Sequence, residues 1–116
     1  MGQSFSTPIF TPALTSEDFT SVGVGQIYEA TPFTYTVFSI QVLQNGGTMS
    51  AWKAVLQASI DGVFFTDILT HDTTMENAEV LYSNSGKYSS VYFRANIKTL
   101  DLGTATSITV KMTATN

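Results

Sequence analysis

The chain has 116 residues, no cysteine, a formal net charge of −4 at pH 7 and only 12% charged residues. This length corresponds to one domain that buries roughly two-thirds of the surface of its unfolded chain, so a core forms without covalent staples. The lack of cysteine excludes disulfides and cysteine-ligated zinc, the acidic balance disfavours a phosphate-binding surface, and no apolar run approaches the roughly 20 residues of a membrane-spanning helix.

Two prolines mark residues 1–18 as an extended N-terminal arm. Pro8 and Pro12 oppose pairing in a central strand, which favours a path along a surface or a sheet edge. The apolar side chains of the arm would be exposed if it stood alone, so we expect it to pack over the domain's own open end or on a neighbouring subunit. These side chains are Phe5, Ile9, Phe10 and Leu14.

Residues 19–116 are predicted to form a single all-β domain. Strand-forming residues are frequent, and no stretch has a helical period. Seven or eight short strands, with turn signals roughly every 8 to 12 residues, favour a two-sheet antiparallel sandwich. We expect a jelly-roll-like strand order, with an immunoglobulin-like order as the alternative, because both produce the same alternation.

Residues 33–69 are predicted to form a three-strand meander. The first strand slips by one position near Val37, which indicates a bulge or a strand with both faces covered. Asn45-Gly46 predicts a hairpin, because both central residues of a type I′ turn need positive φ. The following strand points Trp52 into the core, and Asp61-Gly62 predicts a second two-residue turn.

Two adjacent phenylalanines follow this second turn. Neighbouring side chains on a strand point to opposite faces, so only one of Phe64 and Phe65 faces the inner side of its sheet. The other is expected under a loop, a second sheet or another molecule. On the strand at residues 90–98, Tyr92 and Arg94 fall on the polar face, and both residue types are enriched at protein contacts. We therefore predict that Phe64, Phe65, Tyr92 and Arg94, together with the apolar side chains of the arm, contact another protein.

The sequence offers little catalytic or metal-binding chemistry. The one histidine, His71, lies beside Asp72 in a polar stretch, where we expect an exposed loop residue, and no nucleophile-elbow motif is present. We expect neither an enzyme nor a cofactor. Four acidic side chains within 13 positions offer oxygen ligands for calcium, but their spacing differs from that of an EF-hand, so a solvated acidic loop is preferred. They are Asp67, Asp72, Glu76 and Glu79.

Carbohydrate binding is the alternative function. Sandwich domains of this size often stack sugars on exposed aromatic rings, although tyrosines also lie at sheet rims with the ring buried and the hydroxyl in water. Tyr92 is the strongest candidate because its strand phase places it beside Arg94 on the polar face. The tyrosines are Tyr28, Tyr35, Tyr82, Tyr88 and Tyr92.

Three stretches resemble the small β-sandwich structural proteins of tailed-bacteriophage particles. They are "WKAVLQASIDGVFFTDI" at 52–68, "VYFRANI" at 91–97 and "SITVKMTA" at 107–114. Those proteins often have a strand ending in S-x-D-G, an aromatic residue after the turn, and a final strand rich in Thr and Val. The resemblance covers roughly residues 33–116 and not the arm.

The resemblance implies a virion component, and within that class a capsid decoration or cement protein. In that family jelly-roll-like subunits, frequently homotrimers, bind the major capsid protein on the capsid exterior and bridge neighbouring capsomers, often through extended termini. The same pattern occurs in tail and fibre domains. The resemblance implies no catalytic residue. The acidic charge and the lack of a long apolar run lead us to expect neither a nucleic-acid partner nor a membrane partner.

Overall fold

The computed structural model of the chain describes residues 6–9, 13–30, 35–72, 81–90 and 92–115. These residues form strands and turns without any helix, so the described part contains no helix that could cross a membrane. The strands are β1 (Ser6–Ile9), β2 (Ala13–Phe19), β3 (Gly23–Val24), β4 (Ile27–Ala30), β5 (Tyr35–Asn45), β6 (Ala51–Ser59), β7 (Thr66–Asp72), β8 (Leu81–Ser90), β9 (Tyr92–Asp101) and β10 (Ser107–Thr115).

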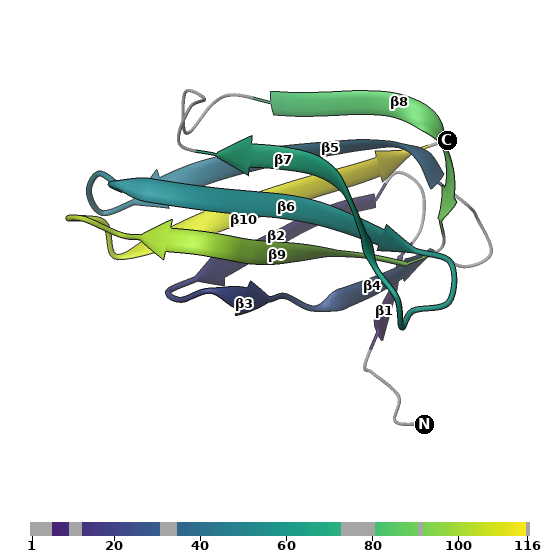
Figure 1. Cartoon of the computed structure of the whole chain (residues 1–116), viewed down its shortest axis with the longest axis horizontal. Coiled ribbons are helices and arrows are strands. Elements are labelled where there is room, and N and C mark those ends of the chain that lie inside the picture. Colours follow the sequence, from purple (N-terminus) through teal and green to yellow (C-terminus); the bar gives the residue numbers. More distant parts are fainter. Residues whose placement is uncertain (1–5, 10–12, 31–34, 73–80, 91, 116) are drawn as a thin grey trace.

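The strands form two sheets packed face to face (Figure 1). Sheet A has the order β1-β4-β9-β6-β7, with β3 also pairing β9, and sheet B has the order β2-β10-β5-β8. The pairings that the structure describes are antiparallel, except that β1 runs parallel to β4. The last strand, β10, therefore lies between β2 and β5 in the interior of sheet B.

Most connections in the chain change sheet. The chain crosses between the sheets in passing from β2 to β3, from β4 to β5, from β5 to β6, from β7 to β8, from β8 to β9 and from β9 to β10. Strands β6 and β7, in contrast, form a hairpin within sheet A. This is the order of a jelly roll. An immunoglobulin-like order would place the first two strands of the sandwich in one sheet. The predicted all-β, jelly-roll-like sandwich is confirmed.

The predicted meander over residues 33–69 is wrong. Strand β5 lies in sheet B and β6 in sheet A, so the connection at Asn45-Gly46 is a crossover and not a hairpin. Gly46 does have the positive φ that the motif indicates, at 74°. Asn45, however, pairs with Ser107 of the distant strand β10, and this long-range pairing overrides the local hairpin signal.

The interior is apolar, as the alternation predicts. Phe38, Ile40 and Val42 on β5 are fully buried, and the register of β5 against β8 shifts between Tyr35 and Val37, which confirms the predicted bulge. Trp52 is confirmed as a core residue. The core cluster consists of Tyr28, Phe38, Ile40, Val42, Met49, Trp52, Ala54, Leu56, Leu69, Phe93, Ala95, Ile97, Ala105, Ile108, Val110, Met112 and Ala114.

The expectation of an exposed His71 is wrong. His71 lies on β7, where its side chain is completely buried. The indole N–H of Trp52 donates a hydrogen bond to its Nδ1, and the two rings are stacked with centroids 6.0 Å apart. The polar residues around His71 in the sequence indicated a loop, but the phase of β7 turns this side chain inward beside Leu69.

The N-terminal residues form edge strands. Strand β2 pairs with β10 from Ala13 to Phe19, and β1 pairs with the edge of β4 from Ser6 to Ile9. A division of the chain between residues 18 and 19 therefore runs through β2. Phe5 and Phe10 lie outside the described residues, as does the side chain of Ile9.

Candidate protein-contact site

The connection between β6 and β7, residues 60–65, is a rigid turn. The predicted two-residue turn at Asp61-Gly62 is wrong, because β6 ends at Ser59 and β7 begins only at Thr66. The Ser59 hydroxyl accepts hydrogen bonds from the backbone N–H groups of Asp61 (3.2 Å) and Gly62 (2.9 Å), and it donates one to Oδ1 of Asp61 (2.8 Å). Hydrogen bonds therefore join the serine of the S-x-D-G motif to both its aspartate and its glycine.

The Asp61 carboxylate holds the rest of the turn. Its Oδ1 accepts hydrogen bonds from the backbone N–H groups of Val63 (2.8 Å) and Phe64 (2.9 Å). The bonds from Val63, Phe64 and Ser59, in that order of size, lower the pKa of Asp61, because they favour its charged form. Gly62 has a φ of +76°, which other residues adopt only with strain. The backbone of the turn is therefore fixed without help from its apolar side chains.

Those apolar side chains project into solvent. Ile60 is 73% exposed, Val63 64% and Phe64 79%, and together we call them the apolar tip. An isolated exposed Leu or Val is ordinary on a protein surface, but three neighbouring large apolar side chains on one fixed turn form a patch of the kind that marks a contact site.

Phe65 points to the outer face of sheet A instead. The guanidinium carbon of Arg94, on β9, lies 4.0 Å from the centroid of the Phe65 ring, a cation–π contact. The Nε of Arg94 also donates a hydrogen bond to Oε1 of Gln57, on β6, at 2.8 Å. Burial lowers the pKa of Arg94. Neither Phe64 nor Phe65 belongs to a strand, so the expectation that one of them faces the sheet interior is wrong.

A row of polar side chains continues from Arg94 across sheet A. The amide Nε2 of Gln57 donates to Oδ1 of Asp67 at 2.7 Å, and Oδ2 of Asp67 pairs with Nζ of Lys98 at 2.6 Å. The hydrogen bonds from Gln57 and then from Lys98 lower the pKa of Asp67. This polar row spans β9, β6 and β7 and ties the base of the turn to three strands.

The polar row also bears on the calcium interpretation. The Asp67 carboxylate accepts a hydrogen bond from Gln57 and forms an ion pair with Lys98. Asp72 is the last residue of β7, and Glu76 and Glu79 lie outside the described residues. Within the described parts of the chain, His, Cys, Asp and Glu side chains do not gather in groups of three that could hold a metal ion.

Tyr92 lies beneath the turn. A Cβ atom added to Gly62 would lie only 3.3 to 3.4 Å from three atoms of the Tyr92 ring, so this ring packs against the glycine backbone. The turn therefore covers part of the surface that a sugar ring would stack on. The half-buried Tyr92 supports the turn, as do Arg94 and Phe65.

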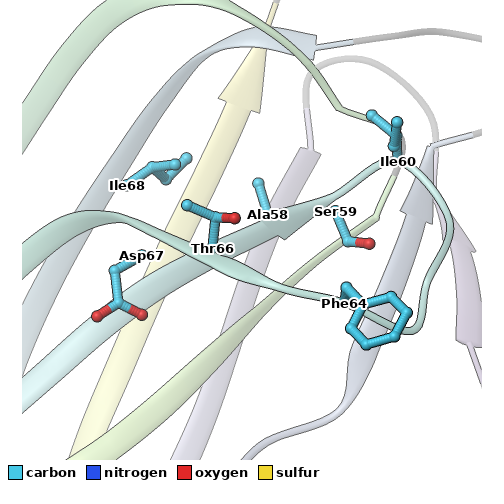
Figure 2. Close-up of a pocket in the computed structure, with 7 residues that line it drawn as sticks. All are labelled: Ala58, Ser59, Ile60, Phe64, Thr66, Asp67 and Ile68. Atoms are coloured by element: carbon cyan, nitrogen blue, oxygen red, sulfur yellow. The ribbon is translucent and has the colours of Figure 1, made fainter.

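A shallow groove of about 350 Å³ lies beside the apolar tip. Figure 2 shows Phe64 and Ile60 at one end of it and Ile68 and Asp67 at the other. Ala58 and Thr66, which are register partners on β6 and β7, lie between these two ends. The lining residues are Ala58, Ser59, Ile60, Phe64, Thr66, Asp67 and Ile68.

The register places the N-terminal strand at the same end of sheet A as the tip. Pro8 of β1 pairs with Glu29, Glu29 with Tyr92, and Tyr92 with Ser59, the last residue before the turn. Figure 1 shows β1 and the β6–β7 connection at the right-hand end of the sandwich. The β5–β6 and β9–β10 connections lie at the left-hand end. Leu14, which is 69% exposed, pairs with Thr113 near the end of β10.

The structure thus brings together four of the predicted contact residues: Phe64, Phe65, Tyr92 and Arg94. Only Phe64 among them presents a largely exposed surface. Sequence reasoning missed Ile60, whose strand phase pointed inward, and Val63. The signal that identifies both is the S-x-D-G motif, because its hydrogen bonds end β6 at Ser59 and start the projecting turn.

No family model and no curated protein matches this sequence. Among solved structures, the chain is similar to the crystal structure of the SPBc2 prophage-derived protein YomS. The TM-score is 0.48 at 12% sequence identity, and the match covers 91% of this chain and 96% of that chain.

Proposed function

We propose that the chain is a non-enzymatic structural protein of a tailed-phage particle, a capsid decoration or cement protein that binds the major capsid protein on the capsid exterior. The observation that carries the proposal is the apolar tip: a turn fixed by Ser59 and Asp61 holds Ile60, Val63 and Phe64 in solvent. A chain gains nothing for its own core from these three side chains, and a partner surface would bury them.

Three further features support an adhesive role. The body is a jelly roll, whose packed sheets provide a rigid base for the tip. The resemblance to phage structural proteins includes the same S-x-D-G turn and the aromatic residue after it. The net charge of −4 suits a protein that lies on a shell and does not bind the packaged nucleic acid.

The mechanism we propose is linkage. A protein that binds only the assembled shell stabilises it by RT ln(1 + [L]/Kd), because dissociation into capsomers would release the bound ligand. On this proposal the tip supplies one contact and the N-terminal arm, with Phe5, Ile9, Phe10 and Leu14, supplies a second. Together the two contacts would form a bridge between neighbouring capsomers. A homotrimer would repeat this bridge around a three-fold position.

The first test is the copy number of the chain in purified particles from its source, measured by quantitative mass spectrometry against the most abundant shell protein. A ratio near one, or between about one-half and one-third, is the expected result for a cement that follows the capsid lattice. A few copies per particle would place the chain in a tail or fibre and overturn the capsid assignment. Complete absence would favour the sugar-binding alternative, which a glycan-binding screen then tests.

A further inference from the structure

Asn45 anchors the start of the β5–β6 crossover to sheet B through its side chain. Its Nδ2 donates hydrogen bonds to the hydroxyl oxygens of Ser107 (2.9 Å) and Thr109 (2.7 Å), both on β10. The Thr109 hydroxyl in turn donates a short hydrogen bond to Oδ1 of Asp18, on β2. A continuous chain of hydrogen bonds therefore links β5, β10 and β2.

The residue after Asn45 is Gly46, and this pair is chemically unstable. The Gly46 backbone nitrogen, after giving its proton to hydroxide, can attack Cγ of the Asn45 amide, since glycine has no side chain to hinder the approach. The new N–Cγ bond closes a five-membered succinimide, the Cγ–Nδ2 bond breaks, and ammonia leaves. Water then opens the ring at either carbonyl and yields aspartate or isoaspartate at position 45.

The folded structure opposes the first step. The attack requires the Asn45 amide to rotate toward Gly46, and the bonds to Ser107 and Thr109 hold it on β10. The Asn45 carbonyl oxygen is also fixed, because it accepts hydrogen bonds from the backbone N–H (2.8 Å) and the hydroxyl (3.1 Å) of Thr106. Deamidation therefore needs a local opening of the end of β5, whose frequency these bonds set.

The product would conflict with its surroundings. Thr109 has one hydroxyl hydrogen, which it donates to Asp18. An aspartate at position 45 would present an acceptor where Asn45 presents a donor, so Thr109 could serve only one of two carboxylates. Two like charges would then flank Thr109, whose own side chain is largely buried.

We propose that Asn45-Gly46 is a site of spontaneous deamidation, that the hydrogen bonds from Asn45 to β10 slow the reaction in the folded protein, and that the product carboxylate weakens the attachment of edge strand β2. The reaction takes water as its co-reactant and needs no enzyme. Deamidation at this site is then a slow, irreversible change that loosens sheet B.

The first experiment measures the rate in the full chain at mildly alkaline pH by mass spectrometry of the peptide that contains Asn45. Ser107→Ala and Thr109→Val each remove one acceptor, and each should raise the rate about fivefold, the factor expected for the loss of one ordinary hydrogen bond. Thr113→Val, on the same strand but without a bond to Asn45, is the matched control. Asn96, whose following residue Ile97 hinders the attack, is the internal reference.

Equal rates in all variants, or no reaction at Asn45 in any of them, would overturn the proposal that these hydrogen bonds slow deamidation. If Thr109→Val does not fold, Ser107→Ala still decides the question, since Ser107 makes no bond to Asp18. A second measurement tests the product: Asn45→Asp should lower the melting temperature, and it should lower it less in an Asp18→Asn background. An equal fall in melting temperature in both backgrounds would contradict the proposed repulsion between the carboxylates at positions 45 and 18.

Discussion

The indole Nε1 of Trp52 lies 3.1 Å from Nδ1 of His71, and the resulting hydrogen bond joins two adjacent strands of sheet A inside the core. Trp52→Phe keeps an aromatic ring but removes the donor and leaves a buried acceptor on His71. We expect the free energy of unfolding to fall by about 1–3 kcal/mol. Chemical denaturation followed by circular dichroism measures this fall.

A second variant separates the hydrogen bond from the lost volume. His71→Leu removes the acceptor, so Trp52→Phe in that background should cost less than it does in the wild type. Identical costs would show that Trp52 contributes by packing alone.

The turn at Ser59 and Asp61 should be sensitive to acid. Its hydrogen bonds lower the pKa of Asp61 below the ordinary 3.8, so the stabilisation is present above that value and is lost as the pH falls through the lowered pKa. Asp61→Asn keeps the shape but removes the charge. The variant should be less stable than the wild type at neutral pH and the difference should shrink in acid. A difference that stays constant with pH would contradict the assignment.

The contact between Arg94 and Phe65 should contribute measurably to the base of the turn. The guanidinium lies 4.0 Å from the ring centroid, and partly exposed pairs of this kind contribute about 0.5–1 kcal/mol. A double-mutant cycle of Arg94→Met and Phe65→Leu measures the coupling in the free energy of unfolding. A coupling of zero would mean that the two side chains only lie side by side.

The apolar tip should matter for attachment and little for folding. Phe64→Ser combined with Val63→Ser changes two exposed side chains, so we expect the free energy of unfolding to stay within about 0.5 kcal/mol of the wild type. Affinity for particles that lack the protein should fall about tenfold or more if these side chains form the centre of the contact. Cosedimentation with such particles gives the affinity.

The matched control for the tip is Val22→Ser. Val22 is 58% exposed but lies in the connection between β2 and β3, away from the turn. An equal loss of affinity in the control and in the tip variant would contradict a contact at the tip.

Tyr28 should ionise at unusually high pH. Burial, and then the charge and hydrogen bond of Glu17, raise its pKa from 10.0 to about 12. The stabilisation linked to this group is therefore complete below pH 10 and is lost as the pH rises toward 12. The difference in tyrosinate absorbance between wild type and Tyr28→Phe gives the pKa, and Glu17→Gln should lower it. An unchanged pKa in Glu17→Gln would assign the whole shift to burial.

The all-β content, and which side chains of a strand face the core, could be predicted from the sequence. Phe93, Ala95 and Ile97 alternate with Tyr92 and Arg94, and the structure buries the first three in the core. This success has a simple cause, because alternation depends only on neighbouring residues along one strand. The choice of partner strands depends on contacts between residues far apart in sequence, and Asn45-Gly46 therefore misled the prediction of a hairpin.

The candidate site could be predicted only in part. The S-x-D-G motif and the pair Phe64 and Phe65 pointed to the correct turn. The roles of the two phenylalanines could not be predicted, because they depend on Arg94 and Gln57, which reach the turn from β9 and β6. The polar row itself has no local signal, since its members are spread from residue 57 to residue 98.

The interior place of β10 in sheet B determines when the protein can fold during synthesis. Both β2 and β5 take this last strand as a neighbour, and the bonds that it forms join residues as far apart as Asp18 and Thr109. A nascent chain that has not yet released β10 exposes two unpaired strand edges, which are sites for aggregation. Sheet B therefore cannot be completed before β10 has been synthesised and released, and a chain cut before β10 would lose the centre of the sheet and not merely its edge.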